Sequence, residues 1–238
     1  MPKLGKRTVA VRERVDRDRF YSPREAVALA RETATAKFDE TIELHILTGL
    51  DGRHADQQIR GSVVLPHGLG REMRVAVFAE GEAATQALDA GADAVGSDDL
   101  VKRFTDGELD FDVVIAQREM MPKIGRLGRV LGPRGLMPNP RNNTVLEEPD
   151  LARGVREAKV GRVEFRLDRT NLMHCVIGKA SFEEDQLVEN LATLIGEIQR
   201  NRPSGGKGQM LLGATLTSTM GPGIPLDVAQ MMALGGES

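Results

Sequence analysis

Hydroxyl side chains gather where an apparent strand runs into the turn TSTMGPG at 217–223. Hydroxyls and free backbone groups at such a turn can bond the 2′-hydroxyls and phosphate oxygens of a structured RNA. The alternative is a plain strand end with incidental Thr and Ser. The segment TAKFDETIE at 35–43 is equally ambiguous, because Phe38 is either a core residue or rests on a base or ribose while Lys37 meets a phosphate.

A basic segment, LGRVLGPRGLMPNP at 127–140, combines three Gly and three Pro with Arg129 and Arg134. This composition predicts an extended or turning backbone with basic side chains projecting toward phosphates or another partner. The alternative is a rigid loop that packs Leu131, Leu136 and Met137 against a sheet. The two interpretations are compatible.

Catalytic groups form no recognisable set. The histidines are isolated, at His45, His54, His67 and His174, and the single Cys175 stands on an apparent strand as a small core residue. Phosphate-binding loops of the G-x-G-x-x-G and G-x-x-x-x-G-K-[ST] types do not occur, and Glu80 and Glu82 stand where a dinucleotide would need backbone amides. We expect no catalytic residues, no metal and no cofactor.

Charge is distributed unevenly along the 238 residues. The formal net charge of −3 argues at first sight against a polyanion partner, but residues 1–37 carry +5, residues 80–112 carry −8 and residues 118–141 carry +5. Salt screens such regions from one another beyond ~10 Å, so local patches matter more than the sum. No apolar run approaches the ~20 residues of a membrane span, and one Cys excludes a disulfide framework. The sequence predicts a cytoplasmic protein without membrane contact.

The two ends of the chain each contain part of an α+β pattern. Ser22-Pro23-Arg24-Glu25 predicts a capping box and a helix to about Ala34, followed by a strand at 42–46, with 59–65 as its expected partner. After Gly161 come alternating strands at 163–167 and 173–178, a helix opened by a capping box at Ser181, and a strand at 210–221. Neither end can build a core alone, so we predict one discontinuous α+β domain from residues 1–66 and 160–238.

Between these ends, strands and helices alternate regularly. Strands are predicted at 73–79, 93–96 and 111–116, with helices between them and another from about Arg118. This alternation indicates βαβ units and a parallel sheet covered on both faces. We therefore expect an inserted, Rossmann-like α/β domain at 67–159, joined to the first domain by two strands that form a hinge.

Several segments, taken together, resemble a known family. They are TAKFDETIE (35–43), DQQIRGSVVLPHGLG (56–70), AGADAVG (90–96), LDFDVVIA (109–116), LGRVLGPRGLMPNP (127–140), KVGRVEFRLD (159–168) and STMGPG (218–223). In this order and spacing they are similar to the ribosomal protein L-one family of the bacterial large subunit, from Lys3 to about Asp227. The acid-rich RNNTVLEEPDL at 141–151 departs from the family pattern, and the tail after Gly223 runs past the family's usual end.

The resemblance implies a function and a set of partners. Members of this family bind the mobile rRNA stalk beside the exit site, assist release of deacylated tRNA, and repress translation of their own operon mRNA; we expect a monomer within the ribosome. Carried over by motif, the RNA-binding residues would be Lys37, Phe38, Thr41, Thr217, Ser218, Thr219, Met220 and Gly221, with Arg166, Asp168 and His174 as neighbours. A nucleotide-dependent enzyme and a protein-interaction scaffold are the alternatives.

The composition also predicts how such an RNA would be recognised. With only seven Phe and one Tyr, stacking cannot be the main mode. Residues 1–66 sum to +2 and residues 160–238 to −2, so general basicity contributes little. We expect shape and 2′-hydroxyl contacts to dominate, with a moderate dependence on salt.

Overall fold

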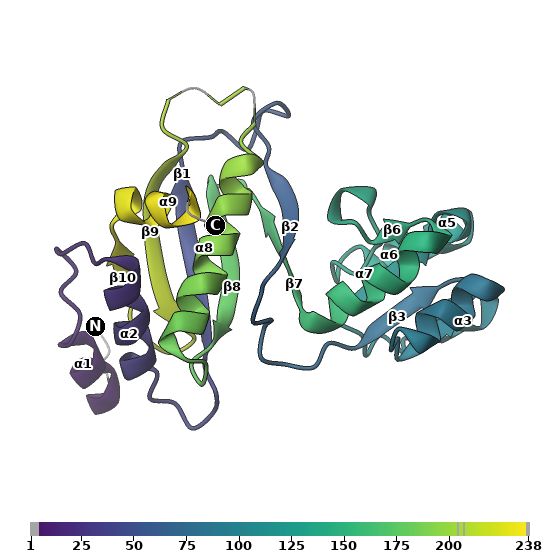
Figure 1. Ribbon diagram of the computed structural model, residues 1–238, viewed down its shortest axis with the longest axis horizontal. Helices are drawn as coiled ribbons and strands as arrows, with labels where there is room; N and C mark the ends of the chain where they lie inside the picture. The colour runs from purple at the N-terminus through teal and green to yellow at the C-terminus, as the bar shows by residue number, and fades with distance from the viewer. Residues whose placement is uncertain (1–4, 204, 207, 237–238) are drawn as a thin grey trace. The chain divides into compact units, whose positions relative to one another are not determined.

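The computed structural model describes residues 5–203, 205–206 and 208–236 (Figure 1). The chain divides into two compact units, Met1–Gly70 with Val163–Ser238, and Arg71–Arg162. The boundaries expected from the sequence, after residues 66 and 159, lie close to these. The first unit is α+β and the second contains a parallel sheet, in agreement with the predicted fold class.

A four-stranded antiparallel sheet forms the centre of the first unit. Its order is β10 (Ile224–Leu226), β9 (Leu211–Ser218), β1 (Thr41–Thr48) and β8 (Leu172–Lys179). The strand from the N-terminal part of the chain therefore lies between two strands from the C-terminal part. This pairing explains why neither end of the sequence holds a complete core.

Helices cover one face of this sheet (Figure 1). They are α2 (Pro23–Thr33) and the long α8 (Glu184–Arg200), while α1 (Lys6–Arg12) and α9 (Val228–Gly236) lie at the two ends of the chain. The capping box predicted for α2 is confirmed, because the Ser22 hydroxyl accepts from the Glu25 amide and the Glu25 carboxylate accepts from the Ser22 amide. The cap predicted at Ser181 is wrong: α8 is capped by Glu183 with Gln186.

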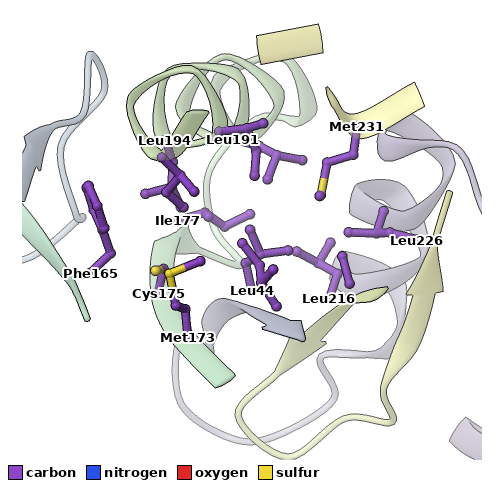
Figure 2. Close-up of a cluster of buried hydrophobic side chains, with 14 of the residues drawn as sticks. Leu44, Phe165, Met173, Cys175, Ile177, Leu191, Leu194, Leu216, Leu226 and Met231 are labelled. Atoms are coloured by element: carbon purple, nitrogen blue, oxygen red, sulfur yellow. The ribbon is translucent and has the colours of Figure 1, made fainter. Parts of the chain in front are cut away.

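The core of the first unit lies between the helices and the sheet. Leu191 and Leu194 of α8 point toward Leu44, Ile177 and Leu216 of three neighbouring strands (Figure 2). Alternate residues of β1, such as Ile42, Leu44 and Ile46, are fully buried, so the intervening residues occupy the opposite, helix-free face. Met231 of α9 is also buried, which ties the C-terminal tail into this core.

One predicted strand pairing is wrong. Residues 59–65 were expected to pair with the strand at 42–46, but β2 (Arg60–Val64) pairs with β7 (Arg162–Arg166) in a separate two-stranded sheet. The physical reason is that both edges of β1 are already occupied by β8 and β9. A Cβ at Gly61 would lie 2.5 Å from the ring of Phe165, so close packing of these two strands requires glycine there.

The second unit contains a parallel sheet, as the alternating pattern predicts. The order is β4 (Ala94–Gly96), β3 (Val75–Phe78), β5 (Val113–Gln117) and β6 (Val145–Leu146). The helices α3 (Glu82–Asp89) and α7 (Glu148–Val160) pack on one face, and α4 (Asp98–Thr105) and α5 (Met121–Ile124) on the other. Short 3₁₀ turns complete the unit at Arg118–Met120, Gly125–Leu127 and Pro140–Asn142.

The basic segment at 127–140 begins as a helix. Gly128–Leu131 forms the short helix α6, so the expectation of an extended or turning backbone is wrong for that part. Leu131 is fully buried, and Leu136 and Met137 pack against the same cluster. This packing is the alternative that the sequence left open, and it uses the apolar residues of the segment as core.

No helix in the described part of the chain has both the length and the apolar character needed to cross a membrane.

A buried amide offers a test of the first unit's packing. Asn190 of α8 donates to the carbonyls of Gly68 (3.2 Å) and Ile177 (2.8 Å) and accepts from the amide of His67 (3.1 Å). We predict that Asn190→Ala lowers the free energy of unfolding by about 3 kcal/mol, because it leaves the contacts to two buried carbonyls and to the part-buried His67 amide unmade. Urea denaturation measures this, and Asn201→Ala, at the exposed end of the same helix, is the matched control. Equal, small losses for both variants would contradict the prediction.

Candidate nucleic-acid interface

The two segments with the strongest RNA signal meet in the structure. Strands β1 and β9 are antiparallel, so the start of β1 lies beside the end of β9. The Thr219 amide donates to the Thr41 carbonyl (3.0 Å), and the Thr41 amide donates to the Thr219 hydroxyl (2.9 Å). We call residues 36–41 together with 217–222 the RNA turn. Eight of the predicted residues, from Lys37 to Gly221, lie within it.

The buried carboxylate of Glu40 organises the RNA turn. One oxygen accepts from the Ala36 amide (2.8 Å), and the other accepts from the Ser218 hydroxyl (2.8 Å) and the Met220 amide (2.8 Å). Glu40 is 1% exposed, yet every contact it makes favours the ionised form. Two backbone amides and one hydroxyl, from two segments far apart in the sequence, are thus held by a single side chain.

The electrostatic balance at Glu40 follows from these contacts. Burial acts to raise the pKa of Glu40, but the hydrogen bonds from Ala36, Met220 and Ser218, with the charge of Arg7, outweigh burial and lower the pKa below its usual value. Glu40 was not among the predicted site residues. In the sequence, Glu40 is an acidic residue beside another acidic residue, Asp39, in TAKFDETIE. No local pattern predicts that Glu40 is buried and Asp39 exposed.

Gly221 allows the backbone of the turn to pack against Ser218. Its amide donates to the Ser218 carbonyl (3.1 Å), and a Cβ at this position would lie 2.4 Å from the Ser218 hydroxyl oxygen. Any larger residue must displace the hydroxyl that bonds Glu40. Close approach within the protein is therefore a sufficient reason for glycine here.

The predicted hydroxyls are largely used inside the protein. The Ser218 hydroxyl donates to Glu40, the Thr217 hydroxyl to its neighbouring carbonyl at Ser218 (2.9 Å), and the Thr219 hydroxyl toward the Thr41 carbonyl (3.3 Å). Thr41 in turn accepts from the ammonium of Lys179 (2.9 Å), a cation that sequence reasoning missed. The hydroxyls of Thr217, Ser218 and Thr219 stabilise the RNA turn from within. Because their hydrogens are donated inside the protein, they can act toward a ligand only as hydrogen-bond acceptors.

Two large apolar side chains project from the RNA turn. Phe38 is 55% exposed and Met220 is 57% exposed, on loops that the Glu40 contacts hold together. Lys37, beside Phe38, is also exposed. Exposed apolar groups on a rigid turn next to a cation are suited to an aromatic or sugar face bearing phosphate.

The other three predicted residues lie elsewhere on the first unit. His174 pairs with His45 in the register of β8 and β1, four residues along the strand from Thr41, or about 14 Å at ~3.4 Å per residue. The Asp168 carboxylate accepts from the Leu172 amide (2.8 Å) and the Thr170 amide (2.7 Å), and the first contact is the main cause of its lowered pKa. Arg166 is exposed at the end of β7. These residues do not join the RNA turn: His174 is on the four-stranded sheet, Arg166 on the separate β2–β7 sheet and Asp168 in the turn between β7 and β8.

A histidine pair occupies the helix-free face. The Nδ1 atoms of His45 and His174 are 2.7 Å apart, so at least one of these nitrogens must lack a proton. Partial burial lowers the pKa of His45, the positive charge of His174 lowers it further, and Glu43 opposes both. The pair therefore favours a neutral His45.

Cys175 and the segment that follows β3 have clear places in the described structure. Cys175 is buried, and burial raises its pKa to about 12, as the core interpretation requires. Within the described residues no three His, Cys, Asp or Glu side chains are grouped so that they could hold a metal. After β3, Glu80 binds the ammonium of Lys123 (2.5 Å) and the hydroxyl of Ser97, which places an ion pair where a dinucleotide would need free amides.

Comparison with known proteins decides the family. A model of the Ribosomal protein L1p/L10e family matches residues 30–222. The chain belongs to this family. It is 55% identical over 235 residues to the large ribosomal subunit protein uL1 of Chloroflexus aggregans, covering 98% of this chain and 99% of that protein. The uL1 proteins of Thermomicrobium roseum (55%, 96% of this chain and 95% of that protein) and Dehalococcoides mccartyi (50%, 93% and 94%) are also similar.

Family membership decides the general role of the chain. As a member of the L1p/L10e family, this chain is a structural constituent of the large ribosomal subunit, on the ribosome in the cytoplasm, and it is not an enzyme. The nucleotide-dependent alternative is thereby removed. Because the Chloroflexus aggregans protein aligns with 235 of the 238 residues, it shares most of the tail that we expected to lie beyond the family's usual end.

Glu40 provides a stability test within this family member. We predict that Glu40→Gln lowers the free energy of unfolding by ~1–3 kcal/mol at neutral pH, because the NH2 group of a glutamine cannot accept from the Ala36 or the Met220 amide, whichever it faces. The folded-state pKa is lowered, so the contribution of Glu40 is present above its usual pKa and is lost as pH falls through the folded-state value. Urea denaturation between pH 3 and 7 measures both effects. Glu43→Gln, three residues further along on β1 and half-exposed, is the control; equal losses in both variants would refute this role.

The histidine pair predicts a second pH dependence. Because the pKa of His45 is lowered in the folded state, stability should decrease as pH falls below about 6.5, where the unfolded chain takes up a proton first. One such group contributes at most ~1.4 kcal/mol per pH unit. His45→Asn should flatten the curve between pH 5 and 7, whereas His54→Asn, an exposed histidine outside the pair, should not. An unaltered slope in His45→Asn would show that the pair does not carry the effect.

Proposed function

We propose that this protein binds the mobile rRNA stalk of the large subunit through the RNA turn of its first unit. The observation that carries the proposal is the exposure of Phe38 and Met220 on a turn fixed by the buried Glu40. Such a turn is ordered before the RNA arrives, so little conformational entropy is lost on binding. The resemblance to stalk-binding family members supports the same residues.

The remaining predicted residues define the extent of the proposed surface. His174 lies on the helix-free face of the four-stranded sheet, and Arg166 is exposed at the end of β7 in the same unit. We propose that a bound RNA strand leaving the RNA turn passes His174. Asp168 is used in the turn between β7 and β8, so its role is to position these neighbours. We assign RNA recognition to the discontinuous first unit and a separate role to the inserted Rossmann-like unit.

The proposal includes two functions that depend on stalk binding. Movement of the stalk accompanies release of deacylated tRNA from the exit site, and a stalk-like structure in the operon mRNA would allow the same surface to repress translation. The operon mRNA would compete with the stalk for the RNA turn, whereas tRNA release would depend on binding of the stalk by that turn. In the ribosome the protein acts as a single copy.

The exposed apolar pair gives the direct test. We predict that Phe38→Ala and Met220→Ala each weaken binding to a stalk transcript about tenfold or more, because each removes ~1.5 kcal/mol of apolar contact. Filter binding or calorimetry measures the affinity at fixed salt. Phe20→Ala is the matched control, since Phe20 is a 70% exposed phenylalanine of the same unit outside the RNA turn. Unchanged affinity in a folded Phe38→Ala/Met220→Ala double variant would overturn the assignment.

The same variants separate the dependent functions. A reporter carrying the operon leader should be repressed by the wild type and by Phe20→Ala, and released by the double variant. Ribosomes containing the double variant should lose exit-site tRNA at an altered rate. If the wild type binds the stalk transcript but the double variant changes neither repression nor tRNA release, the proposal holds only for stalk binding.

A further inference from the structure

A small pocket lies beside the RNA turn, between that turn and helix α1. It has a volume of about 70 Å³ and is lined by Arg7, Thr8, Arg12, Thr35, Met220 and Gly221, among others. Pockets that hold a nucleotide or a drug-sized ligand are several times larger, at ~300 Å³ or more. This one fits a single small group, such as one phosphate.

The two arginines of the pocket make no hydrogen bond or ion pair within the described residues, although the charge of Arg7 acts on Glu40. By contrast, Arg14, two residues beyond α1, is paired with Glu32 (2.7 Å). Arg19 and Arg24 also have carboxylate partners, Glu25 and Asp185. Two unpaired guanidinium groups at one pocket form a site for an anion, because guanidinium geometry matches phosphate oxygens.

The pocket also contains neutral donors of the kind that hold phosphates. Thr8 and Thr35 contribute hydroxyls from α1 and from the segment after α2. Val11 is a buried residue of the lining, and Met220 belongs both to the pocket and to the exposed apolar pair. A phosphate in the pocket would therefore be directly next to the base or sugar that Met220 contacts.

The nearby carboxylate does not exclude an anion. Glu40 is buried and its two oxygens already accept three hydrogen bonds, and the charge of Arg7 helps to stabilise its ionised form. Two guanidinium groups against one carboxylate leave a net local charge of +1. Arg12 has no such partner and remains available to a ligand.

We propose that this pocket, with Arg7 and Arg12 as its cations, binds one phosphodiester of the RNA whose neighbouring nucleotide contacts the RNA turn. The inference rests on the proposed RNA-binding function and gives it a specific phosphate position. Helix α1 then has a role in binding, since it carries both arginines to the edge of the turn. The sequence did not predict this helix.

The dependence of affinity on salt tests the phosphate position. Each phosphate contact that is lost reduces the slope of log K against log[salt] by ~0.7–0.9. We expect Arg7→Gln and Arg12→Gln each to reduce the slope by about that amount and to weaken binding to the stalk transcript about three- to tenfold at low salt. Arg14→Gln, a neighbouring arginine whose charge is already paired, should leave slope and affinity unchanged.

The outcomes distinguish the two proposals. If the wild type does not bind the transcript, the proposed function fails; if it binds and both Arg7→Gln and Arg12→Gln retain the wild-type slope while folded, the phosphate position is wrong. An equal reduction in Arg14→Gln would indicate a general charge effect and would also overturn it. Arg12→Gln is the decisive variant, because Arg7 influences Glu40 and Arg12 does not.

Discussion

The ionised, buried carboxylate of Glu40 is the interaction on which the RNA turn depends. It connects the segment before β1 to the end of β9 across 178 residues of sequence. A buried carboxylate is costly unless its oxygens are hydrogen-bonded, and here a hydroxyl and two backbone amides supply those bonds. The same contacts order two loops that otherwise have no regular structure. Rigidity of the turn is thus a consequence of satisfying one buried charge.

The connection made by Glu40 is possible because β1 occupies the middle of the sheet. Strands β8 and β9, both from the C-terminal part, enclose it, so the first unit is complete only when the chain has returned from the second. The paired strands β2 and β7 carry the chain out at Val64 and back at Arg162. Insertion of a whole unit between them leaves the central sheet and the RNA turn intact. The proposed binding residues therefore depend on strands of the first unit alone.

Local features of the structure were predictable and long-range pairings were not. The capping box of α2 and the buried parallel strand β5 follow from neighbouring residues, so periodicity and cap chemistry identify them. The partner of β2 lies about a hundred residues away, and an alternating pattern does not specify it. Likewise Ser181 has the right chemistry to cap α8, but its hydroxyl donates to Asp39 on a distant loop, and Glu183 caps instead. Tertiary contacts decided each of these cases.

The same division holds at the candidate site: residue types predict where the site is, and packing determines what its side chains can bind. Hydroxyls of Thr217, Ser218 and Thr219 marked the turn correctly as unusual, yet most of their donor capacity is consumed within the protein. What the turn presents outward is an apolar pair, hydroxyl and carbonyl acceptors, and cations at its border. Acceptors of this kind pair with 2′-hydroxyl donors, while apolar groups and a fixed backbone select shape. A nearly neutral unit can therefore bind RNA selectively, because the few charges that matter lie at the edge of a surface whose form is set by Glu40.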